Sequence, residues 1–187
     1  MIAPLTPETL PDLAELFGVS ATTRGCYCMW FVQSAAESES GWSGGNRVAF
    51  EAMACESELP MGLLAYRDGE PVGWVAVGPR QRYGRALRSK VLAGRDAGED
   101  DGVWLVTCLF IRRDARRAGL SKELITAAVD LARSHAATAV EGFPLNAAKP
   151  RSSGDAFVGV EGMFADCGFH VVSHPTPARV LMRHPLP

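Results

Sequence analysis

Residues 103–135 read VWLVTCLFIRRDARRAGLSKELITAAVDLARSH, and this stretch decides the fold. Its first nine residues, 103–111, form an apolar run rich in β-branched and aromatic side chains, which predicts a buried strand. From Gly119 to about His135, apolar residues recur at helical spacing and predict an amphipathic helix. A polar turn with four arginines separates the two. The stretch is therefore expected to form a strand, a basic turn and a helix.

This order of elements predicts an anion site where the helix begins. The first N–H groups of a helix have no partner inside it, and the helix dipole favours negative charge there. Gly119 lets a ligand approach the main chain, and Ser121 is small. The arginines of residues 112–117 add bidentate donors for phosphate. The expected ligand is a phosphate or pyrophosphate, and the alternative is that the turn is only solvated surface.

Two other phosphate-binding motifs do not fit the stretch. The spacing G-x-x-x-x-G-K-[ST] of a Walker loop is absent, which makes a P-loop nucleotide-binding protein the remotest alternative. A dinucleotide-binding fingerprint needs three glycines, and the turn holds one.

The turn does resemble the coenzyme A motif of the GNAT superfamily of acyl-CoA-dependent N-acetyltransferases. The family's pattern is a strand, then [R/Q]-x-x-G-x-[G/A], then a helix. Residues 116–121 read RRAGLS, so only Ser121 departs, standing where the family prefers Gly or Ala. Residues 163–169, MFADCGF, also line up with the family's L-Y-x-x-x-G-F. The resemblance covers about residues 60–183, in the family's order.

The resemblance implies a single α/β (α+β) domain over residues 1–187, a length that suits one full core. Its mixed central sheet would have about six or seven strands, splayed at the coenzyme A site and flanked by helices. Residues 1–60 would supply the acceptor-side helices and a loop, and residues 61–187 the coenzyme A-binding core.

Local patterns predict further elements. A hairpin should turn at Asp68-Gly69, and a strand parallel to the first should run over residues 138–143. Residues 34–47 are polar and glycine-rich, which predicts a loop that could act as a lid, and residues 147–158 are expected to form another loop. The arginine-rich residues 79–95 are expected to be a solvated loop or short helix; alternatively, some of these arginines lie near an anionic ligand.

Acetyl-coenzyme A is the implied co-substrate, and no metal is expected. The pyrophosphate would bind the turn and the helix start, the pantetheine would lie along the splayed strand, and a backbone N–H near Leu109 would stabilise the oxyanion. The expected cofactor-binding residues are Cys108, Leu109, Phe110, Arg116, Arg117, Ala118, Gly119, Leu120, Ser121, Lys122 and Asn146.

The catalytic groups are less evident. Family members often place a Glu on the central strands; residues 103–110 contain none, so Glu141 is the candidate base, with a structural ion pair as the alternative. The tyrosine that commonly protonates the leaving thiolate is replaced by Phe164, which cannot donate a proton. Tyr27 is the candidate acid. It lies in a segment of aromatic and sulfur side chains that could be core or acceptor pocket.

Other features limit the function classes. Cys26-x-Cys28 lacks a second pair of zinc ligands, so a buried sulfur–aromatic cluster is favoured, and five scattered cysteines fit a reducing cytoplasm. No apolar run approaches the roughly 20 residues of a membrane span, and the first ten residues carry no secretory pattern. A net charge of −2 argues against nucleic-acid binding.

Together with the cysteine pattern, the resemblance therefore implies a cytoplasmic N-acetyltransferase that moves an acetyl group from coenzyme A to a primary amine of a small molecule, peptide or protein. The resemblance also implies a possible homodimer, because dimers are frequent in the family. The alternative is a non-catalytic acyl-CoA-binding sensor of the same fold, suggested by Phe164 and the missing acid on the central strand.

Overall fold

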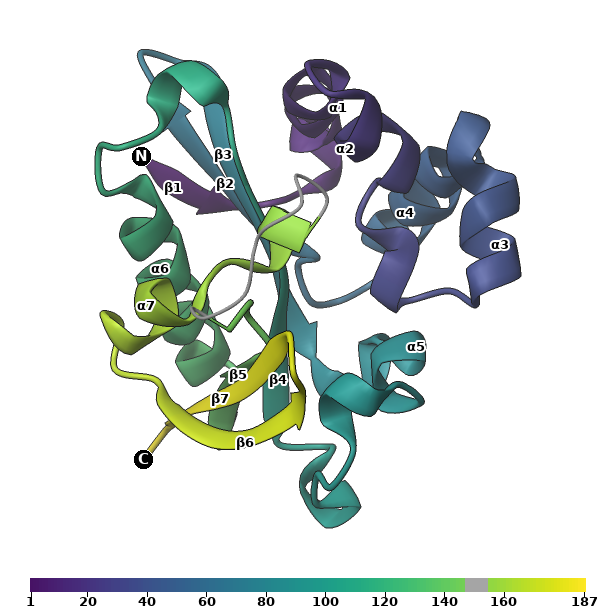
Figure 1. Cartoon of the computed structure of the whole chain (residues 1–187). Coiled ribbons are helices and arrows are strands. Elements are labelled where there is room, and N and C mark those ends of the chain that lie inside the picture. The colour runs from purple at the N-terminus through teal and green to yellow at the C-terminus, as the bar shows by residue number, and fades with distance from the viewer. Residues whose placement is uncertain (147–154) are drawn as a thin grey trace.

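The computed structural model describes residues 1–146 and 155–187 and contains one seven-stranded mixed sheet in the order β1-β2-β3-β4-β5-β7-β6 (Figure 1). Its only parallel pair in the described residues is β4 with β5; the other neighbours are antiparallel. The strands are β1 Ile2–Pro4, β2 Gly62–Arg67, β3 Glu70–Pro79, β4 Val103–Ile111, β5 Ala139–Gly142, β6 His170–Thr176 and β7 Arg179–Pro185.

Helices cover both faces of the sheet. Figure 1 shows α6 and α7 on one side and α1 to α4 on the other. The α-helices are α1 Leu10–Gly18, α2 Ala21–Cys26, α3 Ala35–Ser40, α4 Gly45–Glu56, α5 Gly84–Leu87, α6 Leu120–Ser134 and α7 Glu161–Ala165. Short 3-10 helices are η1 Pro7–Thr9, η2 Met29–Phe31, η3 Gly41–Ser43, η4 Arg80–Arg82, η5 Lys90–Leu92, η6 Ala97–Glu99, η7 Arg113–Ala115 and η8 Asp155–Val158.

The apolar core lies between these layers. Leu124, Ile125 and Ala128 of α6 are fully buried against the side chains of β3 and β4 on one face. On the other face, Phe17 of α1 and Phe50 of α4 pack around Trp74. Because β4 is buried on both faces, its nine residues are almost continuously apolar, as central strands tend to be.

The sheet opens at the carboxyl end of β4. The ladder between β4 and β5 runs only from Val103↔Ala139 to Val106↔Gly142, whereas β4 continues to Ile111. The fully buried Phe164 ring lies under the point of separation, where a Cβ placed on Gly142 would come within 2.4 Å of it. One edge of β4 beyond Val106 therefore lacks a strand partner among the described residues.

Most predicted elements are confirmed. The strand 103–111, the following helix, the hairpin turning at Asp68-Gly69 and the parallel strand within residues 138–143 are all present. No helix in the described ranges is both long and apolar enough to cross a membrane.

The prediction of a loop over residues 34–47 is wrong. These residues form α3, η3 and the start of α4. The Ser34 hydroxyl accepts a hydrogen bond from the Glu37 amide, and the Glu37 carboxylate accepts one from the Ser34 amide at 2.9 Å, a reciprocal cap that starts α3. Of the loop expected over 147–158, residues 147–154 lie outside the described residues, and the remainder is η8.

Candidate functional site

A cleft of about 820 Å3 follows the end of β4 and the start of α6. Its floor comes from the unpaired end of β4, one wall from the basic turn and the helix start, and the other wall from the segment after α1, η8 and α7. The lining residues are Val19, Ser20, Thr22, Leu109, Phe110, Ile111, Arg113, Ala115, Arg116, Arg117, Gly119, Leu120, Ser121, Phe157 and Met163.

Backbone amides at the start of α6 form the polar end of this cleft. Gly119 precedes the helix in a left-handed conformation, φ 81°, that glycine adopts without strain. The amides of Lys122 and Glu123 both donate to the Gly119 carbonyl, at 2.9 and 3.2 Å. Within the described ranges, the amides of Leu120 and Ser121 have no backbone acceptor, so these two are left for an anion.

Lys122 was expected to bind the cofactor, but the structure does not place it at the cleft. Its amide is used within the first turn of α6, and its exposed side chain does not line the cleft. Ala118 does not line the cleft either, although its neighbours do.

The arginines of the turn divide into two kinds. Arg113, Arg116 and Arg117 line the cleft, and Arg116 is oriented by a 2.9 Å hydrogen bond from its Nε to the Ile111 carbonyl. Arg112 instead pairs with Asp114 at 2.9 Å and Glu70 at 3.8 Å and does not line the cleft. The positive charge at the cleft thus comes from three of the four arginines.

A second cavity of about 300 Å3 adjoins the cleft, because Thr22 and Phe157 line both. The two hollows divide β4 between them: Cys108 lines the cavity, whereas Leu109 and Phe110 line the cleft. The cavity is lined by Phe17, Thr22, Thr23, Cys26, Cys28, Trp30, Phe31, Trp42, Thr107, Cys108, Phe157, Val158 and Arg179. A long ligand in the cleft could therefore meet a smaller one in the cavity at Cys108 and Leu109.

Three thiols line this cavity among aromatic rings. The Cys28 Sγ accepts a hydrogen bond from the Trp74 indole at 3.2 Å. A hydrogen bond with the Cys108 thiol, together with burial, raises the pKa of Cys28, so this thiol stays protonated at neutral pH. Among the residues that the structure describes, no group of His, Cys, Asp and Glu is arranged to hold a metal ion.

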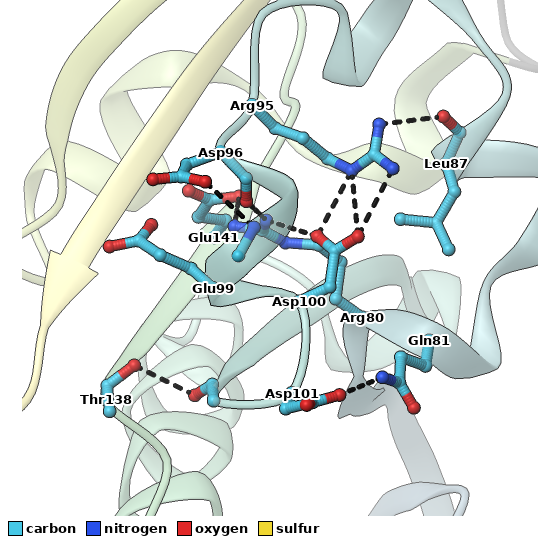
Figure 2. Close-up of polar contacts among 12 residues, drawn as sticks. Arg80, Gln81, Leu87, Arg95, Asp96, Glu99, Asp100, Asp101, Thr138 and Glu141 are labelled. Atoms are coloured by element: carbon cyan, nitrogen blue, oxygen red, sulfur yellow. Dashed lines mark hydrogen bonds and ion pairs between the residues drawn. The ribbon is translucent and has the colours of Figure 1, made fainter.

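Glu141 lies outside both hollows, in the ion-pair network of Figure 2. Its side chain is 3% exposed and accepts from Arg80 Nη2 at 3.0 Å and Arg183 Nη1 at 3.3 Å. Burial raises the pKa of Glu141, and the two guanidinium groups oppose this effect. The geometry favours the structural ion pair over the catalytic base.

Residues 79–95 do form short helices, as one of the two predictions had it, but the network shows that the segment is not simply solvated. The Arg80 side chain is fully buried and also pairs with Asp100 at 2.6 Å, as Figure 2 shows. Arg95 donates to the same carboxylate at 3.1 Å and to the Leu87 carbonyl at 3.1 Å. These arginines hold the segment between β3 and β4 against the sheet and are not near the cleft.

Tyr27 also lies outside both hollows. Its ring is 2% exposed and packs edge-on against Phe17 and Phe50, with centroids 5.1 and 5.4 Å away. Burial raises the pKa of Tyr27 to about 12. The ring lines neither hollow, so the structure does not bring its hydroxyl to the cleft; Trp30 and Phe31 of the same segment do line the cavity.

Two other expected positions also lie outside the hollows. Asn146 follows β5, and its amide donates to the Ala178 carbonyl at 3.0 Å; it lines neither the cleft nor the cavity. Phe164 is completely buried and packs edge-on against Phe169 at 5.1 Å.

Sequence reasoning missed lining residues from four segments. Thr22 lies on α2, which begins after Ser20 as its cap, a local signal that the sequence did contain. Trp42 lies in the helical region predicted to be a loop, and Met163 lies one residue before Phe164 in the tail motif. Phe157 on η8 has no local signal, since only the folded chain brings it to β4.

A comparison with protein families matches residues 23–148 to the Acetyltransferase (GNAT) family. A search of curated proteins finds no match. Among solved structures, an acetyltransferase of the GNAT family from Listeria monocytogenes has a TM-score of 0.63 and 14% identity, with 100% of this chain and 94% of that chain covered.

Two further structures share the fold at similar identity. A ribosomal-protein-alanine N-acetyltransferase from Brucella melitensis has a TM-score of 0.59 and 14% identity, with 100% and 99% of the two chains covered. The PaiA N-acetyltransferase from Thermoplasma acidophilum, solved in complex with coenzyme A, has a TM-score of 0.57 and 15% identity, with 100% and 98% covered.

Proposed function

Because the chain belongs to the GNAT acetyltransferase family, we propose that it transfers an acetyl group from acetyl-coenzyme A to a primary amine of a small molecule or peptide. The observation that supports this proposal is that the cleft and the cavity lie next to each other along β4. The cleft offers free amides and arginines for a diphosphate, and the cavity opens beside it at Cys108. A long anionic thioester and a compact acceptor could therefore meet there.

The cofactor would be held at its charged end by the start of α6. The Leu120 and Ser121 amides would donate to the diphosphate, and the helix dipole would add to the attraction. Arg116 and Arg117 would add charge-assisted hydrogen bonds from the wall of the cleft. Acetyl-coenzyme A accompanies this fold in a Salmonella typhimurium structure, which supports the assignment at the level of the family.

The thioester end would lie along the unpaired edge of β4. Pantetheine carries amides that can pair with a strand edge, and β4 has no strand partner beyond Val106 among the described residues. A backbone N–H near Leu109 would donate to the thioester oxygen as it becomes an oxyanion. The acceptor amine would attack from the cavity, on the Cys108 side.

Calorimetry with acetyl-coenzyme A tests the cofactor assignment. Arg116→Gln and Arg117→Gln should each weaken binding about tenfold to a hundredfold, since a hydrogen bond to a charged group contributes roughly 1.5–3 kcal/mol. Arg112→Gln is the matched control: it removes the same charge from the same turn, but its side chain is paired outside the cleft. Equal losses in all three variants would mean that only general charge matters, and no binding by the wild type would end the proposal.

A non-catalytic acyl-CoA sensor is the second candidate, favoured by one observation. Glu141 and Tyr27 line neither hollow, and Phe164 lacks a hydroxyl. Release of free coenzyme A thiol, followed across primary amines and peptides, separates the two functions. Release above the buffer rate with at least one amine supports transfer; tight acetyl-coenzyme A binding without such release supports the sensor.

A further inference from the structure

We propose that the acceptor is a small aromatic amine that is uncharged at neutral pH, as arylamines are. This inference rests on the proposed transfer to an amine and names its substrate class. It follows from the walls, the charge and the position of the 300 Å3 cavity. A volume near 300 Å3 is at the low end for ligand pockets and suits a compound of one or two rings.

Five of the thirteen described residues that line the cavity are aromatic. They come from four elements: Phe17 from α1, Trp30 and Phe31 from η2, Trp42 from η3 and Phe157 from η8. Planar rings favour planar guests, through edge-to-face and offset contacts that add to simple burial. Such a wall is suited to an aromatic acceptor.

The position of Trp42 is fixed by its neighbours. Its indole lies against Gly25 on α2, where a Cβ would approach Nε1 to 2.2 Å, so only glycine leaves room. The buried Asn46 amide donates to the Gly25 and Ser38 carbonyls, both at 2.8 Å, and ties α2, α3 and α4 together. The contact with Gly25 therefore positions Trp42, which is 42% exposed, before a ligand arrives, and this lowers the ordering cost of binding.

Charge at the cavity disfavours a cationic acceptor. Of the described residues that line it, none carries a carboxylate, and Arg179 is the charged side chain. A second guanidinium, that of Arg85, lies over the Trp30 ring at 3.7 Å from the centroid. An ammonium ion entering this largely apolar space would lose hydration, and none of the described lining residues would offer it a carboxylate in return. An uncharged aromatic amine avoids that cost.

An uncharged amine also matches the absence of Glu141 and Tyr27 from the cavity. Its nitrogen lone pair can attack the thioester carbonyl without prior loss of a proton. The C–N bond forms, the C–S bond breaks, and the electron pair leaves with sulfur. The extra proton on nitrogen passes to that sulfur directly or through water. The products are an N-aryl acetamide and the coenzyme A thiol, so atoms and charge balance.

The test compares four amines by thiol release at saturating acetyl-coenzyme A. Aniline is an uncharged aromatic amine, and benzylamine joins an aromatic ring to a cationic nitrogen. Cyclohexylamine has a similar size but a saturated ring and a cationic nitrogen, and spermidine is a polycation. We expect kcat/KM for aniline to exceed that for cyclohexylamine at least about tenfold, with benzylamine between them and spermidine last.

Two other outcomes distinguish failure of the aromatic acceptor from failure of the proposed acetyl transfer. Cyclohexylamine, spermidine or a peptide acetylated as fast as aniline would overturn this inference and leave the proposed transfer intact. Failure to acetylate any amine or peptide, with acetyl-coenzyme A still bound, would overturn both.

Variants of the wall give an independent measurement. Trp42→Ala should lower kcat/KM for aniline about tenfold and leave the acetyl-coenzyme A Kd unchanged, because Trp42 lines the cavity and not the cleft. Val48→Ala is the control: Val48 is a 68% exposed residue of α4 that lines neither hollow. If Trp42→Ala melts near the wild-type temperature and acetylates aniline as well as Val48→Ala does, the aromatic acceptor is excluded.

Discussion

Two arginine-rich segments of this chain look alike in sequence and differ in structure. The first extends from Arg80 to Arg95, and the second is the turn 112–117. In the first, Arg80 is fully buried and the carboxylates of Asp100 and Glu141 neutralise it (Figure 2). In the second, Arg116 and Arg117 are exposed and line the cleft. The comparison shows that an arginine stabilises the fold where carboxylates pair with it. An arginine without such a carboxylate can bind a ligand.

The largest expected effect comes from breaking the buried network. Glu141→Gln should lower the free energy of unfolding by about 3–5 kcal/mol, because it leaves the buried Arg80 with one carboxylate fewer. Urea denaturation measures the loss. Acetyl transfer per folded molecule should stay near that of the wild type. A variant that is as stable as the wild type but has lost acetyl transfer would instead indicate that Glu141 is the catalytic base. The buried segment would then serve catalysis as well as the fold.

A smaller effect is expected at Asp100, and it should depend on pH. Although burial works in the opposite direction, hydrogen bonds from Arg95 and Arg80 lower the pKa of Asp100. Its stabilising contribution is therefore present above the ordinary aspartate pKa of about 3.9 and is lost as pH falls through the lowered value. Asp100→Asn should cost about 2 kcal/mol at neutral pH.

Urea denaturation of Asp100→Asn and wild type across a pH series checks this sign. The gap between the two proteins should close only on the acid side of the ordinary aspartate pKa. A gap that is the same at every pH would mean that the charge of Asp100 contributes nothing to the network.

The ligand-facing segment should respond to backbone changes rather than to lost ion pairs. Gly119→Ala should cost about 1 kcal/mol, because a residue with a Cβ is strained at φ 81°. The space beside Gly119 is open, since the nearest atom to an added Cβ is Glu123 Oε1 at 3.8 Å. Thermal unfolding gives the cost, and calorimetry should show weaker acetyl-coenzyme A binding. Unchanged stability and affinity would argue against a role for this conformation.

An exposed ion pair supplies the smallest effect and the reference for the other three. Arg133 on α6 pairs with Asp130 three residues earlier, and both side chains are about half exposed. Arg133→Gln should change the free energy of unfolding by less than about 0.5 kcal/mol, as surface pairs usually do. Urea denaturation beside Glu141→Gln makes the comparison direct. A loss above 1 kcal/mol would show that burial alone does not separate these pairs.

The elements with strong local patterns could be predicted from the sequence. The strand and helix around Gly119 follow from apolar periodicity and one glycine, and the hairpin from its Asp68-Gly69 turn. The prediction of a loop over residues 34–47 is wrong because it follows polarity and glycine content alone. The Ser34-x-x-Glu37 cap in the same residues indicates a helix. A local capping signal outranks general polarity there.

The positions of individual side chains in the ion-pair network and the cavity were harder to predict, because their partners are distant in sequence. Arg80 meets Glu141 sixty-one residues away, so no local pattern distinguishes it from a solvated arginine. Tyr27 and Trp30 belong to one short segment, yet the first enters the core and the second lines the cavity. Only the packing of α1, α2 and α4 decides between them. The start of α6 at Gly119 was predictable because it depends on the local sequence and not on such packing.

The Phe164 ring has a consequence for redesign. It acts as a wedge beneath the separating strands, touching the positions of Gly142 and Gly159 so closely that neither could carry a Cβ without movement. Installing a phenol there would place a hydroxyl in a fully packed interior, at a cost of roughly 1–3 kcal/mol if it found no hydrogen-bond partner. A proton donor would be better engineered at Met163, whose side chain already reaches the open cleft.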